Sequence, residues 1–333
     1  MRRLWQRWPA WIGPAAAAWA AAYALALAVA AVTADHPVLG TRALVGPAVA
    51  VLLAGAAVAG LTLTPWAARV PARAVTAGQA AVAVLALASS CWVLLDLISL
   101  VLTGRVEDPH GHSNWLTFAQ RLGFVLAGVL FSAAAVAWHR RSTGSCVRCG
   151  RRHPAGWTAR RYPVPHAAPR GVRRAAYAGC LIFLLYAGAH TLGALGVPGI
   201  EPPGFRPPPI WIVPLSGAVA LADFLLLGLV RPWGMAFPRW TLWLSGRRVP
   251  RALPLTPVWL IAPTLSGYGV ILVVVAVLLA TGVLAGDGNP PYLIAAAGLS
   301  FGGYGIALAV AAVSYQRRTR PRCAAPAGAG VPA

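Results

Sequence analysis

Residues 139–174 have the sequence HRRSTGSCVRCGRRHPAGWTARRYPVPHAAPRGVRR, the one long polar stretch of this chain. The stretch carries ten arginines, no acidic residue and two closely spaced cysteines, Cys146 and Cys149. About four apolar segments lie on either side of it, each near the length of about twenty residues that a helix needs to cross a bilayer. The stretch therefore predicts a basic loop between two membrane-embedded halves.

The composition of the whole chain is typical of a membrane protein. Of its 333 residues, 58% are hydrophobic and 11% are charged, whereas soluble domains carry about 25% charged residues. Backbone groups in lipid must be hydrogen-bonded within the spanning structure, so long apolar runs predict helices and an all-α fold. We expect eight transmembrane helices, at about residues 10–32, 42–64, 75–103, 114–138, 175–196, 210–230, 257–285 and 291–315.

The net charge of +21 comes from arginine alone, since the chain has no lysine. Such a charge would suit nucleic acid, but all but four of the 28 arginines fall in alternate connections and at the two termini. Most of the seven acidic residues fall in the other connections. The positive-inside rule then predicts a bacterial inner-membrane protein with both termini cytoplasmic and no nucleic-acid partner.

The arginine distribution also predicts partners on the cytoplasmic side. Anionic lipid head groups attract arginines that lie close to the membrane surface. We expect the residue 139–174 loop to bind a cytoplasmic protein as well.

The two halves resemble one another. Residues 124–146 align without gaps on residues 301–323, and both segments contain Arg-Arg followed at a fixed distance by a cysteine. The further matches are Pro65-Trp66 with Pro232-Trp233 and Arg69-Val70-Pro71 with Arg248-Val249-Pro250. We expect two parallel four-helix repeats. The predicted domains are residues 1–138, the 139–174 loop, residues 175–316 and a disordered tail, 317–333.

The segment Arg231–Pro250, RPWGMAFPRWTLWLSGRRVP, lies between two predicted spans and mixes arginine with aromatic residues. Pro238 and Gly246 suit the two ends of a short amphipathic helix on the inner membrane surface, and an irregular anchored loop is the alternative. With the arginine-rich CxxCG loop, this segment resembles uncharacterised eight-span membrane proteins of actinobacteria. That resemblance implies the eight-helix fold and no particular activity.

Ionisable side chains within predicted spans are costly and therefore mark candidate functional positions. They are Asp96, Arg121, His190 and Asp223, with Gln120 beside the arginine. A short connection joins the helices of Asp96 and Arg121, so we expect an ion pair, and the depth of His190 suits the same group. The pair either neutralises two buried charges or lies on a path for a solute or proton. Asp223 has no evident partner in the sequence.

Cys146-Val-Arg-Cys149-Gly150 is half of a zinc-knuckle pattern, because a C-x-x-C turn supplies two of the four ligands of tetrahedral zinc. His153, His139 and Cys323 are the candidates for the others. Redox or regulatory thiols and a pair without function are the alternatives. The predicted outer loop Glu107–His112 offers two histidines and two carboxylates, which suit a divalent metal or simply a solvated turn.

Sequence motifs of common enzymes are missing from the chain. It has no Walker motif, no nucleotide-binding glycine pattern, no G-x-S-x-G elbow and no paired aspartate-rich motif for a magnesium diphosphate. The favoured function is a non-catalytic, permease-like or regulatory membrane component. A secondary transporter of a small solute or proton comes next, and a membrane enzyme is least favoured.

Overall fold

The structure is a computed structural model that describes residues 8–33, 45–106, 113–146, 149–152, 159–198, 200, 209–285 and 290–324. The chain divides into two compact units. Unit 1 consists of Met1–Arg161 and Pro321–Ala333, and unit 2 consists of Tyr162–Arg320. The predicted 139–174 loop is therefore shared between the units, and the C-terminal tail belongs with the first.

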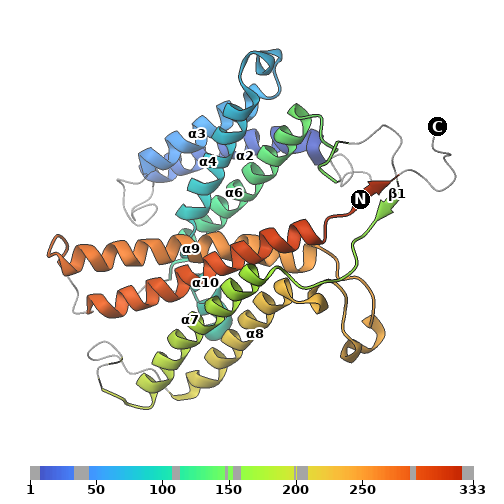
Figure 1. Cartoon of the computed structure of the whole chain (residues 1–333). Helices are drawn as coiled ribbons and strands as arrows, with labels where there is room; N and C mark the ends of the chain where they lie inside the picture. Colours follow the sequence, from blue (N-terminus) through green and yellow to red (C-terminus); the bar gives the residue numbers. More distant parts are fainter. Residues whose placement is uncertain are drawn as a thin grey trace. The chain divides into compact units, whose positions relative to one another are not determined.

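Unit 1 is built from helices joined by short connections (Figure 1). Its elements are α2 (Trp8–Thr33), α3 (Val45–Leu61), the 3-10 helix η3 (Pro65–Arg69), α4 (Ala72–Ser89), α5 (Val93–Thr103), α6 (Trp115–Ser142), β1 (Ala159–Arg161) and β2 (Arg322–Ala324). Helix α2 packs against α3 and α6, and α4 packs along α6.

Unit 2 consists of helices in the part that the structure describes. Its elements are α7 (Arg170–Ala194), η4 (Pro209–Trp211), α8 (Ile212–Val230), η5 (Pro232–Gly234), η6 (Arg239–Leu244), α9 (Ala252–Ala280) and α10 (Pro291–Arg318). Helix α10 packs along α9 and also contacts α7 and α8.

Seven helices of the described chain are long and apolar enough to cross a membrane: α2, α4, α6, α7, α8, α9 and α10. The expectation of an all-α, multi-pass membrane protein is thus confirmed. Helix α3 is apolar but has 17 residues, which is the lower end of the range for a span. The count of eight spans stays a prediction.

The predicted span 75–103 is wrong as a single helix, because it breaks between α4 and α5. The hydroxyl of Ser89 donates to the Leu85 carbonyl at 2.9 Å, and that of Ser90 to the Leu87 carbonyl at 2.8 Å. The Ser90 and Cys91 amides bond three residues back instead of four. Serine pairs that compete for backbone carbonyls tighten and kink helices, which explains the break.

Small residues let helices approach closely in both units, as expected where lipid gives no hydrophobic drive for association. In unit 2, a Cβ added to Gly269 on α9 would lie 2.4 Å from the backbone of Gly302 on α10. In unit 1, Gly123 on α6 leaves room for the ring of Tyr23 on α2, whose hydroxyl donates to the Gln120 carbonyl at 2.5 Å. Such contacts fix the helix pairs that carry the polar residues.

The segment predicted to form an amphipathic helix between Pro238 and Gly246 contains only the short 3-10 helix η6. Leu242 has a φ of 48°, which interrupts the helix. Trp240 and Trp243 are exposed. The irregular, arginine-rich loop with aromatic side chains on its surface is thus the better description.

Candidate metal centre

Three cysteines converge in unit 1. The sulfur atoms of Cys146, Cys149 and Cys323 all lie within 4.8 Å of one another. Cys149 is buried and the other two are half-buried. None of the three is in a disulfide, so the arrangement presents three sulfur atoms at one point. The described part of the chain thus contains a cluster that could hold a metal ion.

A tight turn places the first two thiols. The Gly150 amide donates to the Cys146 carbonyl at 2.6 Å, and the Cys146 amide donates to the Arg151 carbonyl at 3.0 Å. Gly150 has a φ of 62°, a left-handed conformation that only glycine adopts at little cost. The C-x-x-C-G sequence therefore fixes this turn locally.

The C-terminal tail supplies the third thiol. Strand β2 pairs antiparallel with β1, with Cys323 opposite Arg160 in the register. The tail that the sequence predicts to be disordered is therefore ordered at Arg322–Ala324 by main-chain pairing. This pairing carries Cys323 to the C-x-x-C turn.

The spacing of the sulfur atoms fits a tetrahedral ion. Zinc–sulfur bonds of about 2.3 Å place two sulfur ligands about 3.8 Å apart, somewhat closer than the 4.8 Å upper limit observed here. Small side-chain rotations would close that difference. Thiolate donors suit zinc, copper(I) and iron–sulfur clusters, and exclude the hard ions magnesium and calcium.

A bound cation would have to displace the protons of these thiols. Burial, followed by the adjacent Cys149 and Cys146, raises the pKa of Cys323 to about 11. Metal binding requires deprotonated sulfur, so a divalent ion replaces the protons and removes the mutual repulsion. Three thiolates with one zinc ion would carry a net charge of −1.

The other predicted ligands are not part of the described cluster. His139 is exposed near the end of α6 and lies outside the group of converging atoms. His153 falls outside the described residues, as does the Glu107–His112 loop. The spacing of Cys146 and Cys149 predicts these two ligands. The alignment of Cys323 with Cys146 indicates Cys323 as a third.

Asp96 on α5 and Arg121 on α6, which the sequence predicts to lie within the membrane, form an ion pair in unit 1. One guanidinium nitrogen of Arg121 lies 2.5 Å and 2.6 Å from the two carboxylate oxygens of Asp96. The two side chains are only 20% and 10% exposed. Gln120, beside the arginine, is buried. The short connection between α5 and α6 thus pairs the two charges, as the sequence suggests.

The remaining intramembrane candidates lie in unit 2. His190 packs edge-on against the Tyr186 ring, 4.4 Å between centroids. The side chain of Asp223 on α8 has the thiol of Cys180 on α7 as hydrogen-bond neighbour. Its other oxygen, Oδ1, is buried without a hydrogen-bond partner among the described atoms.

Gln79 and Arg318 are among the buried polar residues that the sequence does not single out. Gln79 on α4 is only 1% exposed, and its Oε1 has no hydrogen-bond partner among the described atoms. Arg318 at the end of α10 is 8% exposed. Both lie in or next to apolar runs, and neither has an unusual sequence neighbour that would single it out.

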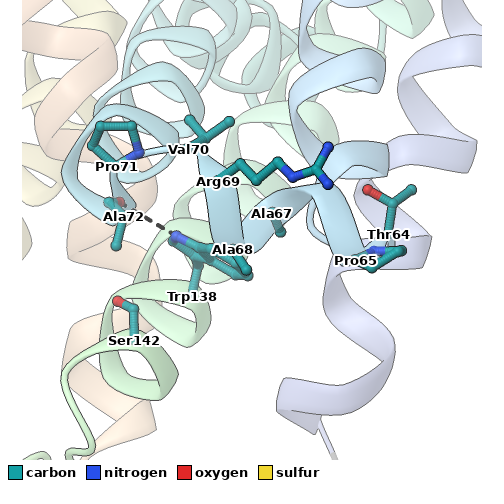
Figure 2. Close-up of a pocket in the computed structure, with 10 residues that line it drawn as sticks. All are labelled: Thr64, Pro65, Ala67, Ala68, Arg69, Val70, Pro71, Ala72, Trp138 and Ser142. Carbon is teal, nitrogen blue, oxygen red and sulfur yellow. Dashed lines mark hydrogen bonds between the residues drawn. The ribbon is translucent and has the colours of Figure 1, made fainter.

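A pocket of about 720 Å³ opens in unit 1 where η3 leads into α4 (Figure 2). None of the intramembrane polar residues lines it. Its lining residues are Thr64, Pro65, Ala67, Ala68, Arg69, Val70, Pro71, Ala72, Trp138 and Ser142.

No protein-family model, curated protein or solved structure matches this chain.

Proposed function

We propose that this chain is a non-catalytic, regulatory or permease-like component of the bacterial inner membrane, organised on its cytoplasmic face by a zinc centre. Cys146, Cys149 and Cys323 hold the zinc ion. The observation that carries the proposal is the convergence of these thiols from a loop and a distant tail. The bound ion supplies no chemistry to a substrate and serves as a cross-link.

The order of the helices supports a shared side for the three cysteines. Four helices long enough to cross a membrane, α7 to α10, lie between Cys149 and Cys323. An even number of crossings returns the chain to the side from which it started. By the positive-inside rule, the arginines around both segments favour the cytoplasm for that side, where thiols stay reduced and available to a metal.

The zinc centre has a structural consequence for the arginine-rich surface. It ties the tail to the loop at the pair β1 and β2, so that the two basic segments lie on one rigid support. A fixed array of guanidinium groups suits anionic lipid head groups and an acidic cytoplasmic protein. His153 is our proposed fourth ligand.

The two units also support a duplication. In each, a Pro-Trp pair opens a 3-10 helix directly after a long helix, at η3 and at η5. In each, Arg-Val-Pro shortly precedes the next long helix, α4 or α9. We infer that eight helices arose from two parallel copies of a four-helix segment, with both termini cytoplasmic.

Metal analysis of the full-length protein, purified in detergent, tests the proposal. We expect about one zinc per chain in the wild-type protein, by inductively coupled plasma mass spectrometry. Cys323→Ser and Cys146→Ser each remove one sulfur ligand. Zinc content should then fall by at least about tenfold, because even the loss of a group that only orients a ligand weakens metal binding about tenfold.

Cys91→Ala is the matched control, because Cys91 is a buried thiol of unit 1 outside the cluster. It should retain the zinc of the wild-type protein. Wild-type protein that contains no metal after purification without chelators, or a Cys323→Ser variant that keeps its zinc, would contradict the proposal.

Transport of a solute or proton ranks second. The observation in its favour is the buried Asp223 oxygen without a hydrogen-bond partner among the described atoms, since unpaired carboxylates in membranes often belong to proton paths. Against it, the Asp96–Arg121 pair is closed on itself.

A further inference from the structure

The pocket of unit 1 has a cationic rim. It lies between η3, the start of α4 and the end of α6, and Arg69 projects along it (Figure 2). The Arg69 guanidinium stacks over the Trp66 ring at 4.0 Å. Arg141, the neighbour of the lining residue Ser142, stacks over Trp138 at 5.7 Å. No described carboxylate lies within ion-pair distance of either arginine.

The aligned arginines of unit 2 are satisfied within their own unit. Arg248, which aligns with Arg69, donates to the Pro163 carbonyl at 3.1 Å. Arg318, which aligns with Arg141, donates to the carbonyls of His166 and Leu229. The segment before α7 therefore supplies carbonyl acceptors in unit 2, although Arg248 is itself exposed and also stacks over Tyr162. In unit 1, Arg69 and Arg141 are exposed and contact aromatic rings.

The hydrogen-bond donors that the pocket offers to a ligand are the N–H groups of the Arg69 guanidinium. The hydroxyl groups of Thr64 and Ser142 already donate to the carbonyls of Leu61 and His139, at 2.9 Å and 3.1 Å. Trp138 is held in the wall by its indole N–H, which donates to the Ala72 carbonyl at 3.3 Å (Figure 2). A ligand that fits these groups carries negatively charged oxygen atoms, and guanidinium matches phosphate especially well.

The residues around the pocket indicate which phosphate-containing ligand it suits. The apolar side chains of Leu63 and Trp66, next to the pocket, are 53% and 59% exposed. They lie at the ends of apolar helices, where aromatic rings mark the membrane–water interface. The volume of about 720 Å³ also exceeds what an inorganic phosphate needs and suits a lipid head group.

We propose that this pocket is a binding site for an anionic phospholipid of the cytoplasmic leaflet, whose phosphate pairs with Arg69 while its acyl chains cover Leu63 and Trp66. The Trp66 ring orients the Arg69 guanidinium through their cation–π contact, so that the guanidinium can bind the phosphate. The site is independent of the zinc centre.

Native mass spectrometry of the full-length protein in detergent tests this inference. The protein is titrated with phosphatidylglycerol, with phosphatidylcholine and with inorganic phosphate. We expect a single tight phosphatidylglycerol adduct in the wild-type protein and weaker binding of phosphatidylcholine. Arg69→Gln should weaken phosphatidylglycerol binding about tenfold, the size expected for a lost charge-assisted hydrogen bond.

Two further variants separate the pocket from general surface charge. Ala68→Leu fills the pocket and keeps every arginine, so it should weaken phosphatidylglycerol binding to a similar degree. Arg174→Gln removes an exposed arginine outside the pocket and should leave that binding unchanged. Equal losses in Arg69→Gln and Arg174→Gln, unchanged binding in Ala68→Leu, or displacement of the lipid by millimolar inorganic phosphate would overturn the proposal.

Discussion

The ends of α6 in unit 1 and α10 in unit 2 share an Arg-Arg pair after an aromatic residue, but their second arginines are placed differently. Trp138 and Arg141 on α6 align with Tyr315 and Arg318 on α10. Arg318 turns inward and donates to backbone carbonyls, one of them of His166 at 2.6 Å. Arg141 is exposed and stacks on Trp138. Arg318 is thus held by backbone carbonyls at the end of α10. Arg141 at the end of α6 keeps its charge exposed.

The aromatic residue of each pair donates a hydrogen bond to a backbone carbonyl. The Trp138 indole donates to the Ala72 carbonyl in unit 1, and the Tyr315 hydroxyl donates to the Gly234 carbonyl at 2.7 Å in unit 2. The first bond ties the last helix of unit 1 to the start of α4, and the second ties the last helix of unit 2 to η5. Each unit therefore has a hydrogen bond from this aromatic residue to a backbone carbonyl. The units differ in the contacts of the arginine three residues later.

A second difference between the units is an ionic pair within the helices. Asp96 and Arg121 pair in unit 1, whereas the aligned residues of unit 2 are Val275 and Gly298. Unit 2 instead holds Asp223, which aligns with Ala56. The polar groups within the membrane segments are therefore specific to each unit, which argues against a symmetric pair of sites.

The largest expected effect comes from breaking this pair in unit 1. Asp96→Asn leaves the Arg121 charge without its partner, and removal of one member of a buried pair costs about 3 kcal/mol. We expect a clear fall in the melting temperature of the detergent-purified protein, measured by light scattering on heating. The double variant Asp96→Asn with Arg121→Gln should recover most of it. A single variant that melts like the wild-type protein would show that the pair does not stabilise unit 1.

A smaller effect sharpens the comparison of Arg318 with Arg141. Arg318→Ala leaves carbonyls of unit 2 without donors and costs about 2 kcal/mol, which corresponds to a fall in melting temperature of about 5 °C. Arg141→Ala removes an exposed cation with a stacking contact and costs about 0.5 kcal/mol. Circular dichroism at 222 nm on heating compares the two, and equal shifts would refute the proposed difference.

Much of the fold follows from the sequence because apolar runs of helical length have one stable solution in lipid. Hydropathy does not predict the helix break after Ser89. It contains no information on serine hydroxyl groups that compete for the carbonyls of Leu85 and Leu87. The sequence does not predict the contrast between Arg318 and Arg141 either. Both follow an aromatic residue and an arginine, but only Arg318 has the segment before α7 beside it to accept hydrogen bonds.

The candidate site could be predicted in part. The spacing of Cys146 and Cys149 and the φ above zero that suits Gly150 are local properties of a C-x-x-C-G turn. The position of Cys323 depends on the pairing of β1 with β2, three residues from each strand and far apart along the chain. No local pattern specifies such a pairing, and only the alignment of Cys323 with Cys146 pointed to it.

The central claim is that one ion joins the loop to the tail through three sulfur atoms. X-ray absorption at the zinc edge of the purified full-length protein tests it most directly. We predict three sulfur ligands at about 2.3 Å and one nitrogen or oxygen ligand at about 2.0 Å, with two sulfur ligands left in Cys323→Ser after reloading with zinc. A first shell of nitrogen and oxygen only, or the same sulfur count in the wild-type protein and in Cys323→Ser, would contradict the account.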